Sequence, residues 1–204
     1  MPPLRSLLIL ACAPLGACNM TVNAPPNALL ATAASGYARY EPGDLPDERI
    51  VATTRKAELL PQVVAYNGDE LPGTIVIRTS ERRLYLVLGD RTAVRYPVGV
   101  GRAGKQWQGR AEVDGAYIEP AWAPTEEIKR DSPDLPDVIP GGAPNNPMGA
   151  RALTLSGGKY AIHGTNRPES VGTYASYGCI RMLNEDIVDL FKRVHVGTEV
   201  VVTL

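Results

Sequence analysis

Closely spaced prolines limit what the middle of the chain can fold into. Between residues 101 and 149 the chain contains Pro120, Pro124, Pro133, Pro136, Pro140, Pro144 and Pro147. Proline lacks a backbone donor and clashes with the preceding helical turn, so this segment cannot form a long helix. The chain has 20 glycines and 18 prolines among 204 residues, well above the usual combined share of about 12%. We therefore predict a mainly β fold with many turns.

Short apolar or alternating stretches flank this turn-dense segment, as strands require. Gly89 and Asp90 lie between two of these stretches and predict the turn of a hairpin. The predicted strands cover residues 74–79, 83–88, 92–100, 151–155, 160–163 and 199–204. Residues 49–60 predict a further strand followed by a helical turn.

One substantial helix is predicted at residues 185–193, near the C-terminus. Asn184 is suited to its N-cap, with acidic residues in the first turn and basic residues in the last. Four apolar residues share one face of this helix: Ile187, Leu190, Phe191 and Val194. Thr125, followed by two glutamates, predicts the start of one short helix.

The first 17 residues are typical of a secretory signal peptide. Arg5 precedes an apolar stretch at residues 7–15, which is far shorter than the ~20 residues of a membrane-spanning helix. The sequence Leu-Gly-Ala-Cys that follows resembles a bacterial lipobox, which predicts lipidation of Cys18 and a membrane anchor. Asn19 after it favours the outer membrane. The alternative is a plain signal peptide with an incidental cysteine.

Composition divides the chain into three parts. Residues 1–17 form the signal peptide, residues 18–70 a lipidated cysteine with a tether or lead-in, and residues 71–204 the folded domain. Cleavage removes Cys12 and lipid occupies Cys18, so Cys179 is the cysteine left in the folded domain. No disulfide can then form within it. A lone thiol in an oxidising compartment is either buried and inert or kept for its reactivity.

The stretch around Cys179 contains the residue types that thiol chemistry needs. His163 follows a predicted strand and lies 16 residues before Cys179, with a glycine-containing loop between them. A nearby imidazole can activate a thiol nucleophile. The backbone amides of Gly178 and Cys179 are candidates for an oxyanion site. Arg181 shares the side of Cys179 if this piece is extended, and its guanidinium suits a substrate carboxylate.

The motifs around these residues resemble the L,D-transpeptidase catalytic domain, the YkuD family. That family has a His, a loop, and then Ser/Thr-His-Gly-Cys followed by Ile/Leu and Arg/Asn; this chain has I-H-G-T-N and S-Y-G-C-I-R-M. Further segments that resemble the domain are P-G-T-I-V-I, R-L-Y-L-V, P-N-N-P-M-G-A-R-A-L, N-E-D-I-V-D-L and V-G-T-E-V-V-V. The resemblance covers residues 71–204 and implies a β-sandwich or barrel with one main α-helix near the C-terminus.

The resemblance also implies roles for individual residues. Cys179 would be the nucleophile and His163 the base; the loop would be shaped by Ser176, Tyr177 and Gly178, and substrate bound by Arg181, Gly164 and Thr165. The implied reaction is attack on the diaminopimelate–D-Ala bond of a peptidoglycan stem peptide, with release of D-Ala and formation of a thioester. A second stem peptide then gives a 3→3 cross-link, a lysine of an envelope protein gives an anchored protein, and water gives carboxypeptidase activity. The implied location is the periplasm, and no cofactor is implied.

One residue departs from the family motif, because Tyr177 occupies the position of its second His. A phenol forms hydrogen bonds but carries no charge near neutral pH, so the pair of Cys179 and His163 remains while rate and pH profile change. A catalytically weakened site would leave a cell-wall-binding lipoprotein. Papain-like enzymes place the Cys before the His, and sortases separate the two residues much further, so both classes fit less well.

Charge and residue counts argue against other classes of function. The chain has 21 Lys+Arg and 22 Asp+Glu, which gives no basic surface for nucleic acid. Two histidines and one mature cysteine do not make a closed zinc site. His195 is predicted to be a surface residue at the helix end. Trp107 and Trp122 are predicted either to line a substrate groove or to pack against the sheet.

Overall fold

The computed structural model describes residues 59–204. The predicted signal peptide, Cys18 and nearly all of the strand and turn predicted at residues 49–60 lie outside the described residues. Within residues 59–204 no helix is long and apolar enough to span a membrane.

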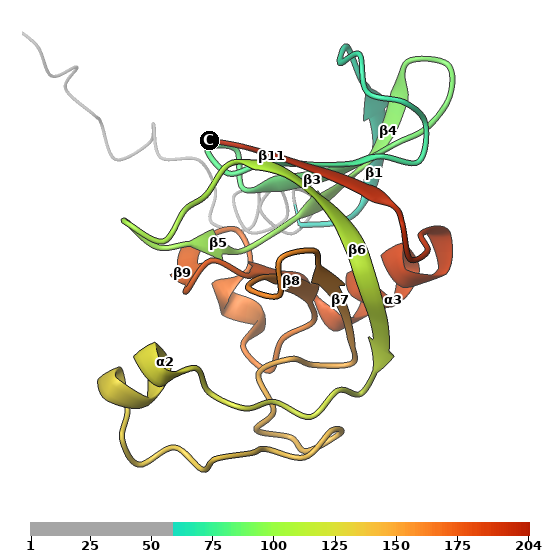
Figure 1. Ribbon diagram of the computed structural model, residues 1–204. Helices are drawn as coiled ribbons and strands as arrows, with labels where there is room; N and C mark the ends of the chain where they lie inside the picture. Colours follow the sequence, from blue (N-terminus) through green and yellow to red (C-terminus); the bar gives the residue numbers. More distant parts are fainter. Residues whose placement is uncertain (1–58) are drawn as a thin grey trace, which may run out of the picture. The chain divides into compact units, whose positions relative to one another are not determined.

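The described residues form strands, two α-helices and one 3₁₀ turn, which Figure 1 shows along the chain. In chain order they are β1 (Gln62–Ala65), β2 (Ile75–Arg78), β3 (Arg83–Val87), β4 (Thr92–Pro97), β5 (Val100–Gly101), β6 (Gly109–Ile118), α2 (Glu126–Asp131), β7 (Arg151–Leu155), β8 (Ala161–His163), the 3₁₀ turn η1 (Pro168–Ser170), β9 (Tyr174–Ser176), β10 (Ile180–Arg181), α3 (Asn184–Arg193) and β11 (Glu199–Thr203).

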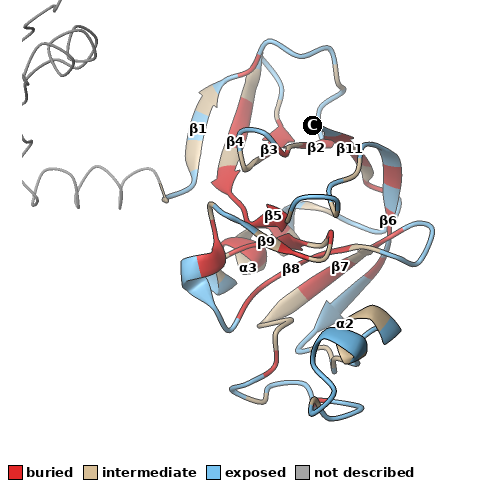
Figure 2. Cartoon of the chain, turned by 90° about the vertical axis from the view of Figure 1, so that its left-hand side faces the viewer, coloured by how far each residue is buried: buried red, intermediate tan, exposed pale blue. Residues whose placement is uncertain are grey.

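The strands form one large sheet that bends at β6. Its strand order is β1-β4-β3-β2-β11-β6-β7-β8-β10, and β5 pairs separately with β9. The first part of β6 pairs antiparallel with β11, and the second part pairs antiparallel with β7 after a register shift between Val113 and Gly115. Figure 2 shows β6 running between the group that contains β2, β3 and β11 and the group that contains β7 and β8. The predicted mainly β architecture with one main helix is confirmed.

The hydrophobic core lies between these strands and α3. Fully buried residues come from both groups of strands and from the helix: Ile75, Leu84, Leu153, Ile162, Ile187 and Leu190. The fully buried Tyr96 of β4 donates its hydroxyl to Asp189 Oδ2 of α3 at 2.6 Å. Arg193 donates to the same oxygen at 2.9 Å. The amphipathic face of α3 therefore packs as its sequence predicts, and a polar anchor fixes the helix to the sheet.

Two strand predictions within the domain were wrong. The segment 101–149 was predicted to be dense in turns, but Gly109–Ile118 forms the ten-residue strand β6. Its buried positions are Ala111, Val113 and Gly115, which are too small or too weakly apolar to give a clear strand signal. The single strand predicted at 92–100 ends at Pro97, because a proline cannot donate to the next strand pair, and β5 begins at Val100.

The ends of two other elements also differ from expectation. The predicted lead-in of residues 18–70 contributes β1, which pairs with β4 and so adds an edge strand ahead of residue 71. Asn184 is the first residue of α3 and does not cap it; Leu183 takes the N-cap position without a side-chain hydrogen bond. The predicted cap at Thr125 is confirmed, since its hydroxyl accepts from the Ile128 N–H at the start of α2.

Candidate active site

Two short parallel strands bring His163 and Arg181 side by side. β8 and β10 pair with Ile162 opposite Ile180 and His163 opposite Arg181. Ile162 and Ile180 are buried in the core. Because side chains alternate along a strand, His163 and Arg181 point away from the face that Ile162 and Ile180 bury. Cys179 lies in the turn directly before β10.

His163 is buried and has a neutral imidazole near neutral pH. It is 4% exposed, and its Nδ1 lies 2.6 Å from the Gly164 carbonyl oxygen. A carbonyl can only accept, so Nδ1 carries the hydrogen in this contact. Burial, and next the charge of Arg181, lower the pKa of His163 to about 4, against the opposing effect of the Gly164 and Pro147 carbonyls. The imidazole is thus available as a proton acceptor.

Cys179 is a partly buried free thiol. Burial raises the pKa of this thiol, while the Ala161 N–H and the charge of Arg181 act in the opposite direction. With the pKa of the thiol above its usual range and that of His163 well below, each of the two side chains is uncharged near neutral pH. The thiol becomes a strong nucleophile only after it loses its proton.

The loop before Cys179 is fixed by the buried hydroxyl of Ser176. This hydroxyl accepts from the Gly178 N–H at 3.0 Å and donates to the Cys179 carbonyl at 2.6 Å. Ser176 therefore shapes the loop, as the family resemblance implies. The same contact uses the Gly178 amide within the loop and competes with the oxyanion role predicted for it. The amide of Cys179 is the stronger candidate for that role.

Gly178 is required by its backbone and by its neighbours. Its φ is +118°, a conformation that L-residues rarely adopt. A Cβ at this position would lie 2.4 Å from Tyr160 Cε1. Tyr160 is itself stacked on Trp107, with ring centroids 4.7 Å apart, and Trp107 Nε1 donates to the Gly178 carbonyl at 3.0 Å. Trp107 thus supports the loop that precedes the thiol. Of the two roles predicted for Trp107, a groove wall or a packing residue, the structure shows packing.

Arg181 lies at the wall of a cavity of about 210 Å³. Its Nε is buried without a hydrogen-bond partner within residues 59–204, and burial lowers the pKa of its guanidinium. The cavity is lined on one side by Trp122, Ile128, Ser132, Leu135 and Ile139 and on the other by Asn145, Pro147, Asn166, Arg167, Tyr177 and Arg181. A buried cation with an unused donor beside an open cavity suits an anionic ligand.

Cys179 itself lines a second cavity, of about 440 Å³. The other lining residues are Asp114, Tyr117, Thr154, Gly158, Lys159, Tyr160 and Ala161. Arg181 and Cys179 thus line different cavities, although they lie two residues apart on β10 and the turn before it. A ligand that reaches both residues would connect these two spaces.

Gly164 and Thr165 are positioned by Asn184, a residue predicted only as a helix cap. Asn184 Oδ1 accepts from the N–H of Ala150 at 3.0 Å and of Thr165 at 3.2 Å, and its Nδ2 donates to the Thr165 carbonyl at 3.1 Å. A Cβ on Gly164 would lie 2.3 Å from Asn184 Oδ1. Gly164 and Thr165 therefore form part of the support behind His163, and Thr165 is 4% exposed.

The side chain of Tyr177 is directed toward α2. Its hydroxyl donates to Asp131 Oδ2 at 2.6 Å, and the guanidinium carbon of Arg102 lies 4.0 Å from its ring centroid. Arg102 also donates to Asp131 Oδ2, at 2.9 Å. Asp131 and Arg102 were not identified from the sequence, because neither lies near Tyr177 along the chain and neither belongs to a recognisable motif.

The remaining predictions concern residues outside this cluster. Trp122 lines the cavity at Arg181, whereas His195 is exposed and contacts the Val196 carbonyl through Nδ1. Within the described part of the chain, no group of three or more His, Cys, Asp or Glu side chains is arranged to hold a metal ion.

Comparison with known proteins identifies the family. The family model of the L,D-transpeptidase catalytic domain, YkuD, matches residues 72–202. The chain is 43% identical over 141 residues to the probable L,D-transpeptidase YbiS of Escherichia coli, a match that covers 65% of this chain and 45% of that protein. It is 39% identical over 141 residues to the probable L,D-transpeptidase ErfK/SrfK of the same species, over 65% of this chain and 44% of that protein. The chain belongs to the YkuD family of L,D-transpeptidase catalytic domains.

Solved structures share the fold at low sequence identity. The L,D-transpeptidase from Mycobacterium smegmatis aligns with a TM-score of 0.51 and 14% identity, over 64% of this chain and 58% of that one. L,D-transpeptidase 3 from Mycobacterium tuberculosis aligns with a TM-score of 0.51 and 16% identity, over 71% of this chain and 62% of that one. The matched part of this chain spans less than half the length of YbiS and ErfK/SrfK.

Proposed function

We propose that this protein is a peptidoglycan L,D-transpeptidase that acts through a covalent thioester on Cys179. The observation that supports this most is the register of β8 and β10, which sets His163 opposite Arg181, two residues after Cys179. Family membership and relatives named as L,D-transpeptidases support the same reaction class.

The first half of the proposed reaction forms the thioester. His163 Nε2 takes the proton of the Cys179 thiol as sulfur attacks the carbonyl of the diaminopimelate–D-Ala bond. The Cys179 N–H stabilises the oxyanion of the tetrahedral intermediate. When the C–N bond breaks, His163 returns the proton to the departing amine, D-Ala leaves, and the acyl group remains on sulfur.

Arg181 is proposed to hold the terminal carboxylate of the donor peptide. Arg181 lines the cavity, so its guanidinium can meet a carboxylate there, and its Nε is a buried donor without a partner in the described structure. The carbonyl that Cys179 attacks lies one residue from that carboxylate in the stem peptide. A donor that contacts both Arg181 and Cys179 would then be fixed across the attack position.

The second half of the reaction resolves the thioester. An amine, deprotonated by His163, attacks the thioester carbonyl, the C–S bond breaks, and the thiol regains its proton. A second diaminopimelate amine gives a 3→3 cross-link, and a protein lysine gives an anchored protein. Water in place of the amine gives L,D-carboxypeptidase activity.

Mass spectrometry of reaction products tests this proposal. The purified protein is incubated with disaccharide-tetrapeptide, with a Cys179→Ala variant beside it. D-Ala loss and a 3→3 dimer in the wild type alone support the transpeptidase. D-Ala loss without a dimer identifies a carboxypeptidase or a transferase that needs another acceptor. If the two proteins leave the substrate equally intact, the enzymatic proposal fails and a cell-wall-binding role replaces it.

We also propose that the protein is exported to the periplasm and anchored by lipid on Cys18. The support is the sequence of residues 1–18, with its apolar stretch and lipobox-like Leu-Gly-Ala-Cys. Growth with an alkyne-labelled fatty acid should label the wild type and leave a Cys18→Ala variant unlabelled. Equal labelling of both proteins, or of neither, would contradict the lipid anchor. Fractionation of the cell envelope then identifies whether the labelled protein lies in the inner or the outer membrane.

A further inference from the structure

A cluster of three side chains joins the loop before Cys179 to α2. The Tyr177 hydroxyl donates to Asp131 Oδ2, and Arg102 donates to the same oxygen while its guanidinium lies over the Tyr177 ring. These residues come from three separate parts of the chain: the turn after β5, the last residue of α2, and the loop before the thiol. We refer to Arg102, Asp131 and Tyr177 as the clasp.

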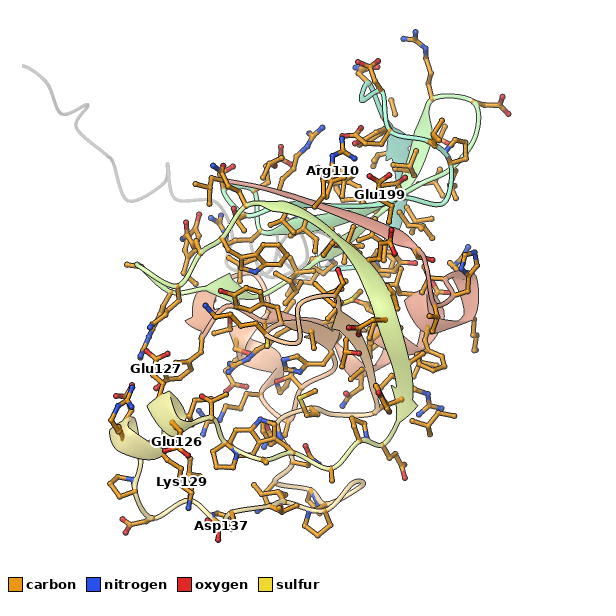
Figure 3. All side chains as sticks on the ribbon, in the orientation of Figure 1. Arg110, Glu126, Glu127, Lys129, Asp137 and Glu199 are labelled. Carbon is orange, nitrogen blue, oxygen red and sulfur yellow. The ribbon has the colours of Figure 1, made fainter. Side chains whose placement is uncertain are left out.

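The segment that the clasp attaches, residues 121–139, is braced within itself. Lys129 Nζ donates to the Leu135 carbonyl at 2.6 Å and to Asp137 Oδ1 at 2.7 Å. Trp122 and Ile139 exchange two backbone hydrogen bonds of 2.9 and 2.7 Å. Figure 3 shows Lys129 and Asp137 close together on this segment, with Glu126 and Glu127 on α2 above them. This bracing allows the segment to move as one unit.

The two ends of segment 121–139 are attached by different kinds of contact. At its base the buried amide of Asn146 donates to the carbonyls of Pro120 and Pro140, both at 2.9 Å. At its tip the clasp and an ion pair of Lys105 with Glu127 connect it to the rest of the domain. Asp131 and Arg102 are about half-exposed. Exposed ion pairs contribute little to stability, so the tip is the end that opens most easily.

Opening at the tip would move part of one wall of the cavity at Arg181. Ile128, Ser132 and Leu135 line this cavity from the part of segment 121–139 near the tip, and Tyr177 and Arg181 line it from the rest of the domain. We propose that Tyr177 is a positioning residue that clasps segment 121–139 over this cavity and so fixes the site that receives the donor peptide. The identity of that ligand rests on the proposed function, whereas the clasp does not.

Tyr177→Phe tests the clasp, because it removes the hydroxyl and keeps the ring under Arg102. Hydrogen–deuterium exchange of the full chain is followed in peptides from residues 122–139, and KM and kcat are measured for D-Ala release from the tetrapeptide. Tyr174→Phe is the matched control: its hydroxyl accepts from Arg82 at 2.9 Å, and Arg82 lies 5.0 Å from its ring, outside the cavity. Asp131→Ala removes the same hydrogen bond from the other side.

We expect Tyr177→Phe to speed exchange in residues 122–139 and to raise KM, each by about three- to tenfold, the range of one net hydrogen bond. Asp131→Ala should change exchange and KM by the same factor, and the double variant should change them little further. In each variant kcat should change less than about twofold. Tyr174→Phe should match the wild type in all three quantities.

Unchanged exchange in both Tyr177→Phe and Asp131→Ala would overturn the clasp. So would a fall in kcat with unchanged exchange, because Tyr177 would then act on the thiol directly. If Tyr177→Phe does not fold, the exchange rates of residues 122–139 and the KM of Asp131→Ala test the clasp instead. If the wild type releases no D-Ala, the proposed function fails, and exchange alone still decides the clasp.

Discussion

Arg181 lies directly opposite His163 in the parallel pair of β8 and β10, and its charge contributes to lowering the pKa of the imidazole. The Arg181 Nε has no hydrogen-bond partner within residues 59–204. A carboxylate bound at Arg181 would offset the positive charge that His163 experiences and would make the imidazole a stronger base. Under the proposed function, one guanidinium would therefore couple donor binding to the strength of His163 as a base.

Replacing Arg181 tests this coupling. Arg181→Gln should lower kcat/KM for D-Ala release by about 10- to 100-fold, the worth of a hydrogen bond to a charged group. It should also raise the pKa of His163 above about 4, while burial, the larger cause, keeps it below 6.5. Enzyme kinetics and NMR titration of the imidazole measure the two effects. Arg82→Gln, outside both cavities, is the control, and full activity of Arg181→Gln would contradict the assigned contact.

The resting thiol should show the pH dependence of a neutral pair. Because the pKa of Cys179 is raised and that of His163 is lowered to about 4, iodoacetamide should alkylate Cys179 at a rate that climbs steadily from pH 6 to above pH 9. Mass spectrometry of the peptide that contains Cys179 separates this reaction from Cys12 and Cys18. A plateau of high reactivity between pH 5 and 8 would instead indicate a thiolate–imidazolium pair.

Gly178→Ala should damage the loop through a steric clash. The new Cβ would meet Tyr160, so the Trp107–Tyr160 stack should shift, stability should fall by about 1–3 kcal/mol and D-Ala release should be largely lost. Urea unfolding and tryptophan fluorescence measure the change. Gly157→Ala is a matched control, since Gly157 also has a positive φ, of 92°, but nothing lies within 4 Å of its Cβ position. Equal damage in both variants would assign the effect to backbone strain alone.

Asp186, in the first turn of α3, should make stability depend on pH. Its Oδ2 is buried without a hydrogen-bond partner in the described structure, and burial, with Glu185 and Asp189, raises its pKa from 3.8 to about 7. Between these values the folded protein keeps a proton that the unfolded chain has lost, so this contribution to stability decreases as pH rises from about 4 to 7.

Asp186→Asn removes this titration. The variant should match the wild type near pH 4 and exceed its stability by on the order of 1–3 kcal/mol at pH 8. Urea denaturation across this pH range measures the difference, with Asp134→Asn, an exposed aspartate, as the control. A constant difference at every pH would show that Asp186 is not the titrating group.

Local sequence pattern was sufficient for much of the fold. Period-two alternation marked β3 and β4, and the apolar face of α3 with its charged ends marked the helix, because each of these signals lies within a few residues. The strand β6 was not predicted, because its buried face carries Ala111, Val113 and Gly115 rather than large apolar residues. A strand whose inner face is small gives little periodic contrast against a background rich in glycine and proline.

The candidate site was predictable in its chemistry and not in its supports. Cys179 and His163 became candidates because few residue types perform thiol chemistry, and Arg181 because its guanidinium suits a substrate carboxylate; these roles stay predictions. Tyr177 and Asp131 are 46 positions apart, and Asn184 binds Ala150, 34 positions away. Such side-chain contacts depend on how loops return over the sheet, which no local period or propensity encodes.

The position of β11 constrains the order in which the domain can assemble. Residues 199–203 pair parallel with β2 and antiparallel with β6, so this last strand lies inside the large sheet. Until it is added, β2 and β6 have no common neighbour, and the two groups of strands cannot close on a shared core. The hairpins of β2, β3 and β4 can pair locally, but the sheet that joins the two groups can close only after residues 199–203 are available to pair.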